Sequence, residues 1–117
     1  MYPTFMQELS PQQMKIIERL FEAGFRPIAI PPYESALCMK RGSCAAVLAP
    51  VPNAGLKLLA PATFIVDGNL SVRLKRGNGE VFVWKKTELP ATTERLAELD
   101  TFRRELTEIL ELPPTQQ

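Results

Sequence analysis

Five basic side chains gather within residues 70–86, and they are the groups in this chain whose type and spacing could do chemistry. They are Arg73, Lys75, Arg76, Lys85 and Lys86. Cationic groups this close together can contact neighbouring phosphates, with an affinity that falls steeply as salt rises. Phe82 and Trp84 lie among them and could stack on bases. The pattern fits binding of nucleic acid, RNA above all, but it fits better a solvated strand whose lysines keep its edge from pairing.

The absence of histidine removes several other chemistries. Histidine is the usual general base and the commonest metal ligand, so Ser-His-Asp and Cys-His arrangements are excluded within one chain. Glu34, Asp67 and Glu80 are the only acids between residues 23 and 87, which leaves no convergent carboxylate pair. No glycine-rich loop leads into a helix to cradle phosphate. The sequence therefore predicts no catalytic residue, no cofactor and no metal, and a protein that is not an enzyme.

The two cysteines, Cys38 and Cys44, are the only sulfur ligands. In a hairpin whose loop is centred on Arg41 they would sit opposite each other, as half of a metal site in a dimer or as a redox-sensitive bridge. Two ligands are too few for a structural zinc site. Their apolar neighbours favour buried, inert thiols instead.

The turn at Gly77-Asn78-Gly79 decides which way the only tryptophan points. A two-residue Asn78-Gly79 turn would pair Arg73 with Trp84 and create a basic, aromatic face. A three-residue loop would pair Leu74 with Phe82, so that one face is wholly apolar and Arg73, Lys75 and Lys85 share the outer face with Val81 and Val83. We favour the three-residue loop, because burying one consistent face fixes the register of a hairpin.

A helix at each end of the chain must position these residues. Ser10-Pro11-Gln12-Gln13 reads as a capping box with proline at the first helical position. The stripe that follows consists of Met14, Ile17, Leu20 and Phe21. Gly24 is suited to end this helix in the left-handed conformation. A second helix is expected over residues 93–112, capped by Thr92 or Thr93, with the apolar stripe Leu96, Leu99, Phe102, Leu106 and Ile109.

Short apolar runs separated by turn residues fill the segment between the helices and predict strands. The expected strands are 27–30, 36–40, 43–49, 56–60, 63–66, 70–76 and 81–86, some of which could be loops in the proline-rich middle of the chain. Connections this short require antiparallel pairing. The sequence therefore predicts an α+β protein: an antiparallel meander of about five or six strands, flanked by an N-terminal and a long C-terminal helix in two layers.

The length of 117 residues predicts a single domain over 1–117, with loose tails at 1–9 and 113–117. The charge is uneven: residues 61–86 carry a net charge of +3 and residues 87–117 a net charge of −4. This split fits contacts within one molecule, a charge-complementary homodimer or a partner surface. No stretch is long and apolar enough for a membrane span, and two cysteines without a secretory signal favour the cytoplasm.

Two hypotheses of function follow from these observations. The first is a small cytosolic, non-catalytic protein-interaction domain, acting as an adaptor, a regulator or a chaperone-like module, and able to self-associate. The second is RNA binding through the basic face of the hairpin at 70–86. A third, an enzyme or a carrier of a small ligand in an apolar pocket, has no motif to support it.

Overall fold

The computed structural model describes residues 9–31, 33 and 36–111, and within them it has two helices and eight strands. Helix α1 spans Pro11–Glu22 and helix α2 spans Thr93–Leu110. The strands are β1 (Arg26–Pro27), β2 (Leu37–Arg41), β3 (Cys44–Pro50), β4 (Leu56–Val66), β5 (Asn69–Leu70), β6 (Val72–Arg76), β7 (Gly79–Trp84) and β8 (Thr87–Pro90). The predicted α+β class with antiparallel strands is confirmed. The expected tails at 1–9 and 113–117 lie outside the described residues, apart from Leu9.

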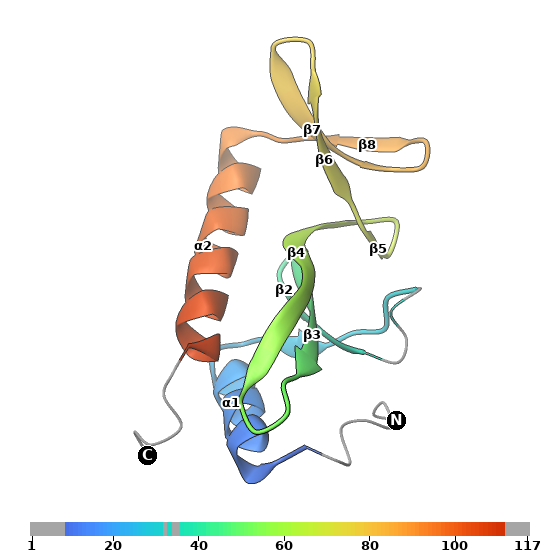
Figure 1. Ribbon diagram of the computed structural model, residues 1–117. Helices are drawn as coiled ribbons and strands as arrows, with labels where there is room; N and C mark the ends of the chain where they lie inside the picture. Colours follow the sequence, from blue (N-terminus) through green and yellow to red (C-terminus); the bar gives the residue numbers. More distant parts are fainter. Residues whose placement is uncertain (1–8, 32, 34–35, 112–117) are drawn as a thin grey trace.

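The strands form two antiparallel sheets rather than the single meander expected from the sequence (Figure 1). Strands β1 to β5 make one sheet in chain order, and β6 to β8 make a second sheet of three strands. The chain passes from one sheet to the other at Ser71, which is buried and donates from its Oγ to the carbonyl oxygen of Phe64, 2.7 Å away. Strand β8 was not predicted, because Thr87-Glu88-Leu89-Pro90 is short and contains proline.

Helix α1 forms where the local signals placed it. Ser10 and Gln13 make the capping box, and Gly24 has a φ of +95° at the end of the helix. Phe25 then folds back, and its N–H donates to the carbonyl oxygen of Leu20 at 2.9 Å. The predicted stripe is wrong at Met14, which is 38% exposed, whereas the polar Gln13 is buried.

The sequence predicts a strand that ends at residue 60, before Pro61, but strand β4 continues through this proline. Its pairing with β3 is irregular at this point, since Ala45 pairs with Thr63 and Val47 with Ala60. A bulge of this kind tolerates a residue that cannot donate to the ladder, so that 56–60 and 63–66 join into one long strand.

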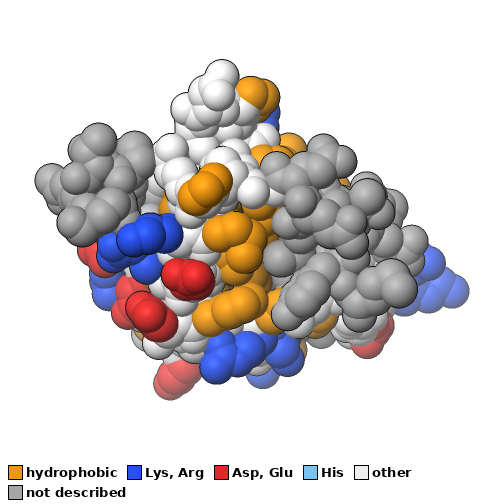
Figure 2. Space-filling view, turned by 90° about the horizontal axis from the view of Figure 1, so that it is seen from below, with side chains coloured by type: hydrophobic (Ala, Val, Ile, Leu, Met, Phe, Trp, Pro, Cys, Tyr) orange, Lys and Arg blue, Asp and Glu red, His pale blue; other side chains and the backbone are white. Residues whose placement is uncertain are grey.

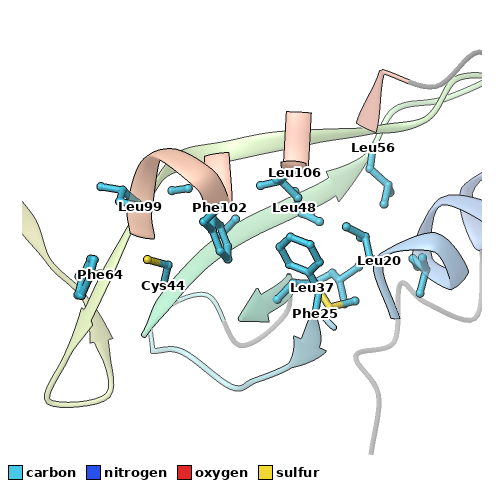
Figure 3. Close-up of a cluster of buried hydrophobic side chains, with 14 of the residues drawn as sticks. Leu20, Phe25, Leu37, Cys44, Leu48, Leu56, Phe64, Leu99, Phe102 and Leu106 are labelled. Carbon is cyan, nitrogen blue, oxygen red and sulfur yellow. The ribbon is translucent and has the colours of Figure 1, made fainter. Parts of the chain in front are cut away.

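The main core lies between both helices and one face of the five-stranded sheet, which gives the two expected layers. Figure 3 shows the side chains from α1, β2, β3, β4 and α2 that meet there. Phe25 and Phe102 pack edge to face with ring centroids 5.2 Å apart. A smaller cluster of Ile30, Cys38, Ala45 and Val47 covers the opposite face of the sheet.

Helix α2 is fastened to the sheet by polar contacts as well as by its apolar stripe. Leu99, Phe102 and Leu106 are buried. The Nη2 of Arg103 donates to the carbonyl oxygen of Ala62 at 2.7 Å, and the Ser43 N–H donates to Oε2 of Glu98 at 3.0 Å. These contacts hold the helix across β4 and the β2–β3 turn.

Candidate functional site

The β6–β7 hairpin has neither of the two registers expected from the sequence. Its turn residues are Gly77 and Asn78, so that Arg76 pairs with Gly79 and Arg73 pairs with Phe82. Gly77 has a φ of +61°, as the first central residue of a type II′ turn requires. The favoured prediction is therefore wrong: Phe82 and Trp84 share a face with Arg73 and Lys75 rather than with Val72 and Leu74.

The face that carries Phe82 packs onto the body of the protein and is called the inner face. Phe82 is fully buried and stacks on Phe64 of β4, with ring centroids 4.7 Å apart. Trp84 and Leu89 are partly buried against the same core. The burial of Phe82 fixes which face of β7 is turned to the core. The type II′ turn at Gly77-Asn78 fixes which residues of β6 share that face.

The opposite face of the three-stranded sheet, called the outer face, is largely apolar and open to solvent. It carries Val72, Leu74, Val81, Val83 and Pro90, together with the Arg76–Glu88 ion pair. Val72 is 56% exposed and Leu74 is 42% exposed. Adjacent exposed apolar side chains on one sheet face are typical of a contact surface. The two-residue alternative considered from the sequence has these same two faces, but it was not favoured, because β7 alternates valine with aromatic residues and both of its faces therefore read as apolar. A glycine at position 77, suited to a type II′ turn, was the available signal.

The five basic residues of the candidate site do not form one patch. Arg73 makes a bidentate contact with Glu80, at 3.1 Å from Nε and 2.7 Å from Nη2, and Arg76 is paired with Glu88. Lys75 pairs in register with Glu80. Lys85 and Lys86 form the β7–β8 turn, at a different tip of the sheet from the β6–β7 turn (Figure 1). The structure thus brings Arg73 and Lys75 together on the inner face and places Lys85 and Lys86 elsewhere.

The Arg73–Glu80 pair perturbs both partners. The guanidinium of Arg73 donates hydrogen bonds to the Glu80 carboxylate and so holds the pKa of Glu80 below its usual value. The same hydrogen bonds raise the pKa of Arg73. The two hydrogen bonds to Glu80 hold the guanidinium of Arg73 in place near the start of β6.

A groove of about 480 Å³ lies where the two sheets meet, beside the first residues of β6. Its lining includes Tyr33, Pro61, Ser71, Arg73, Trp84 and Arg103. Trp84 is half-buried there, and the Nζ of Lys85 lies 5.7 Å from the centroid of its ring system. Arg103 donates to a backbone carbonyl, so its charge adds to that of Arg73 in the groove. Sequence analysis did not connect Tyr33 or Arg103 with this region, because only the fold brings them to it.

A second hollow, of about 420 Å³, is lined by residues that hold the fold together. Its Arg41 contacts Glu105 at 2.7 Å, donates to the carbonyl oxygen of Ala23 at 3.1 Å, and stacks over Phe25 at 4.4 Å. A Cβ on Gly42 would lie 2.6 Å from Oε2 of Glu98. The polar groups that line this hollow already bind one another within the fold, so we assign the hollow a structural role.

The lower end of the molecule also exposes hydrophobic side chains, in a band bordered by charged residues (Figure 2). Helix α1 and the start of β4 lie at this end (Figure 1), and their exposed large hydrophobics are Met14, Leu58 and Leu59. The outer face of the three-stranded sheet lies wholly within the described residues.

Both cysteines are buried and free, and the sheet does not bring their side chains together. Cys38 pairs with Val47 and Cys44 pairs with Arg41, so the two thiols lie on opposite faces of the sheet, and the alternative in which a loop centred on Arg41 sets them opposite each other is wrong. Burial, and to a lesser extent the Glu98 carboxylate, raises the pKa of Cys44 to about 12. Burial also raises the pKa of Cys38. Both therefore remain thiols at neutral pH, in agreement with inert packing.

Within the described ranges, no cluster of three or more Cys, Asp or Glu residues could hold a metal ion. Neither helix in this part of the chain is long and apolar enough to cross a membrane. A scan of protein-family models, a search of curated proteins and a search of solved structures gave no significant match to this chain.

Proposed function

We propose that the protein is a small, non-catalytic protein-interaction domain of the cytoplasm, with an adaptor or regulatory role, and that it binds its partner through the outer face. The observation that carries this proposal is the exposure of Val72 and Leu74, on a sheet whose other face supplies the fully buried Phe82. Covering apolar surface is favourable by about 25 cal/mol per Å². A partner that covers the outer face gains this free energy.

The rigidity of the supporting sheet adds to this argument. Phe82 and Leu89 anchor β7 and β8 in the core, and Oγ1 of Thr87 donates to Oδ2 of Asp67, 2.5 Å away in the β4–β5 turn. The outer face is thus presented on strands whose positions are fixed from behind. A surface that needs no reordering loses less conformational entropy on binding.

A comparative pull-down of the tagged full chain from its native cells tests the proposal. The variant Val72→Thr with Leu74→Thr places β-branched side chains, which suit a strand, at both positions but makes them polar. The matched control is Leu58→Thr with Leu59→Thr, because these leucines are 41% and 48% exposed on β4. A stoichiometric protein held by the wild type and the control, but lost by the outer-face variant, supports the proposal. Equal recovery of every partner by both variants contradicts it.

RNA binding through residues 70–86 is the second candidate function. It rests on Lys75, Lys85 and Lys86, for which the described residues supply no ion pair. Binding through these lysines predicts an affinity that falls as salt rises and that Lys85→Glu with Lys86→Glu weakens. Nuclease-sensitive RNA in the pull-down favours this function, and an affinity indifferent to salt contradicts it.

A further inference from the structure

Strand β6 is an edge strand with one free side. It pairs with β7, and none of the described residues pairs with its other side. All five of its residues are exposed. Because the turn joins Arg76 to Gly79, and antiparallel hydrogen bonding alternates along the strand, the N–H and C=O groups of Arg73 and Lys75 point away from β7. These groups are free to pair with another strand.

We propose that the free edge of β6 accepts an extended segment of a partner protein as a fourth strand, and that this segment alternates acidic and apolar residues. The inference rests on the proposed function, since it names the chemistry of the partner that the three-stranded sheet binds. In recognition of this kind, backbone hydrogen bonds supply affinity and alternate side chains supply specificity.

The acidic positions follow from the charges on the inner side of the edge. Partner residues directly opposite Arg73 and Lys75 would project on the same face as these two cations. Glu80 is the carboxylate that pairs with Arg73 there, while Arg103, in the adjoining groove, donates to a carbonyl oxygen. An excess of positive charge therefore meets the incoming segment, and carboxylates at these positions are favoured.

The apolar position follows from the outer face. A partner residue between the two acidic positions projects to the opposite side of the sheet, beside Leu74, which is 42% exposed. An apolar side chain there extends the outer face and covers part of it. The segment that fits is consequently acidic, apolar and acidic in succession.

A second copy of this chain does not fit the same edge. Only Arg73 and Lys75 direct backbone groups outward from β6. Every symmetric pairing of two β6 strands through them therefore opposes two basic side chains, whether Arg73 with Arg73, Arg73 with Lys75, or Lys75 with Lys75. Like charges directly opposite each other destabilise a strand pair. The edge thus rejects its own copy and selects an oppositely charged strand.

Titration of the isotopically labelled full chain with two short capped peptides tests this inference. One peptide alternates glutamate with valine, and the other alternates lysine with valine. We expect amide shifts concentrated in β6 with the glutamate peptide, and weak or no binding of the lysine peptide. Lys75→Pro removes one outward N–H, as edge strands tolerate, and is expected to weaken binding about tenfold. Lys75→Gln removes the charge but keeps the backbone N–H, so it measures the effect of the charge alone, and it is expected to weaken binding about threefold.

Lys75→Glu supplies an independent readout if the proline variant folds poorly, because it should exchange the preference from the glutamate to the lysine peptide. Failure of the glutamate peptide to bind, equal binding of both peptides, or glutamate-peptide binding that Lys75→Glu leaves unchanged overturns the inference. The proposed function is judged separately, by loss of the native partner in the variant Val72→Thr with Leu74→Thr. An outer-face partner can thus be confirmed even when the peptides show that it does not add a strand to β6.

Discussion

Phe64 of β4 and Phe82 of β7 stack with their ring centroids 4.7 Å apart and an angle of 17° between their planes. Both side chains are buried. The stack joins the five-stranded sheet to the three-stranded sheet, and it fixes which face of β7 points inward. Arg73 of β6 pairs with Phe82 and shares its inward face. Its neighbours Val72 and Leu74 therefore project to the outer face, because successive residues of a strand point to opposite sides.

Phe82→Ala is expected to lower the free energy of unfolding by about 3–5 kcal/mol, as large-to-small changes of a buried phenylalanine do. The change leaves a cavity beneath β7 and loosens the sheet that carries Trp84. Denaturant unfolding gives the free energy, and a red shift of Trp84 emission in the folded variant reports the loosening. Phe82→Leu keeps much of the apolar volume and should cost less. Equal stability of Phe82→Ala and wild type would contradict the role assigned to this stack.

Gln13 links the start of α1 to the β3–β4 loop. Its Oε1 accepts from the Ser10 N–H at 2.9 Å, and its Nε2 donates to the carbonyl oxygens of Val51 and Ala54 at 2.9 Å and 3.1 Å. Gln13→Ala is therefore expected to lower the free energy of unfolding by about 2 kcal/mol, because it removes one half of the capping box and the side-chain donor to part-buried carbonyl oxygens of the loop.

Gln13→Glu is the informative comparison for this residue. It keeps the acceptor for Ser10 but places a carboxylate against carbonyl oxygens, so at neutral pH we expect it to be no more stable than Gln13→Ala. Protonation of the carboxyl restores a donor, so the deficit should shrink as pH falls. A Gln13→Glu protein as stable as wild type at neutral pH would show that the contacts with the loop contribute little.

The pKa of Glu80 should be measurably below its ordinary value of 4.5, because Arg73 donates to its carboxylate and Lys75 adds a smaller attraction. The stabilisation from a lowered pKa is present above the pKa of the unfolded chain and is lost as pH falls through the pKa of the folded state. Arg73→Gln is expected to return the pKa toward 4.5, and Lys75→Gln to raise it less. Titration of the Glu80 carboxyl carbon by NMR gives all three values. A pKa unmoved by Arg73→Gln would rule out the ion pair in solution.

Cys44 is expected to make the protein less stable at alkaline pH. Burial raises its pKa from 9.0 to about 12, so between these values the unfolded chain releases a proton that the folded protein retains. The contribution of the Cys44 thiol to the free energy of unfolding is therefore fully present below pH 9 and falls as pH rises toward 12. Comparison of Cys44→Ala with wild type isolates this contribution: the variant should be less stable at neutral pH because of its cavity, and the difference should narrow above pH 9. A constant difference across the range would contradict the raised pKa.

Lys85→Gly is expected to stabilise the protein. Lys85 has a φ of +54° in the β7–β8 turn, a conformation that costs an L-residue about 1 kcal/mol and costs glycine little. We expect a gain of about 0.5–1 kcal/mol in the free energy of unfolding. Lys86→Gly is the control, since Lys86 is the other turn residue and its φ is not positive; it should not stabilise. Destabilisation by Lys85→Gly would mean that the turn relaxes in solution.

Local chemistry in the sequence determined the elements whose signals are complete within a few residues. Ser10, Pro11 and Gln13 define the start of α1, and Gly24 defines its end, because capping satisfies backbone groups of the same turn. Asp67 and Gly68, both with positive φ, likewise specify their own hairpin turn. The α+β class and the antiparallel connections follow from such elements and from the short segments between them.

Only the tertiary structure decided the features on which the candidate site depends. The sequence of β7 offers two apolar faces, and Phe82 turns inward because Phe64, in a different sheet, is there to receive it. The same holds for Gln13, whose burial needs the distant carbonyl oxygens of the β3–β4 loop, and for Pro61, which is accommodated by a bulge opposite β3. The free energy gained by burying a side chain depends on the groups that pack against it. Those groups come from distant parts of the chain and are brought there by the fold, not by residues next to it in the sequence. The sequence therefore placed the basic residues in one segment, while the packing of one phenylalanine determined which side of the sheet stayed exposed.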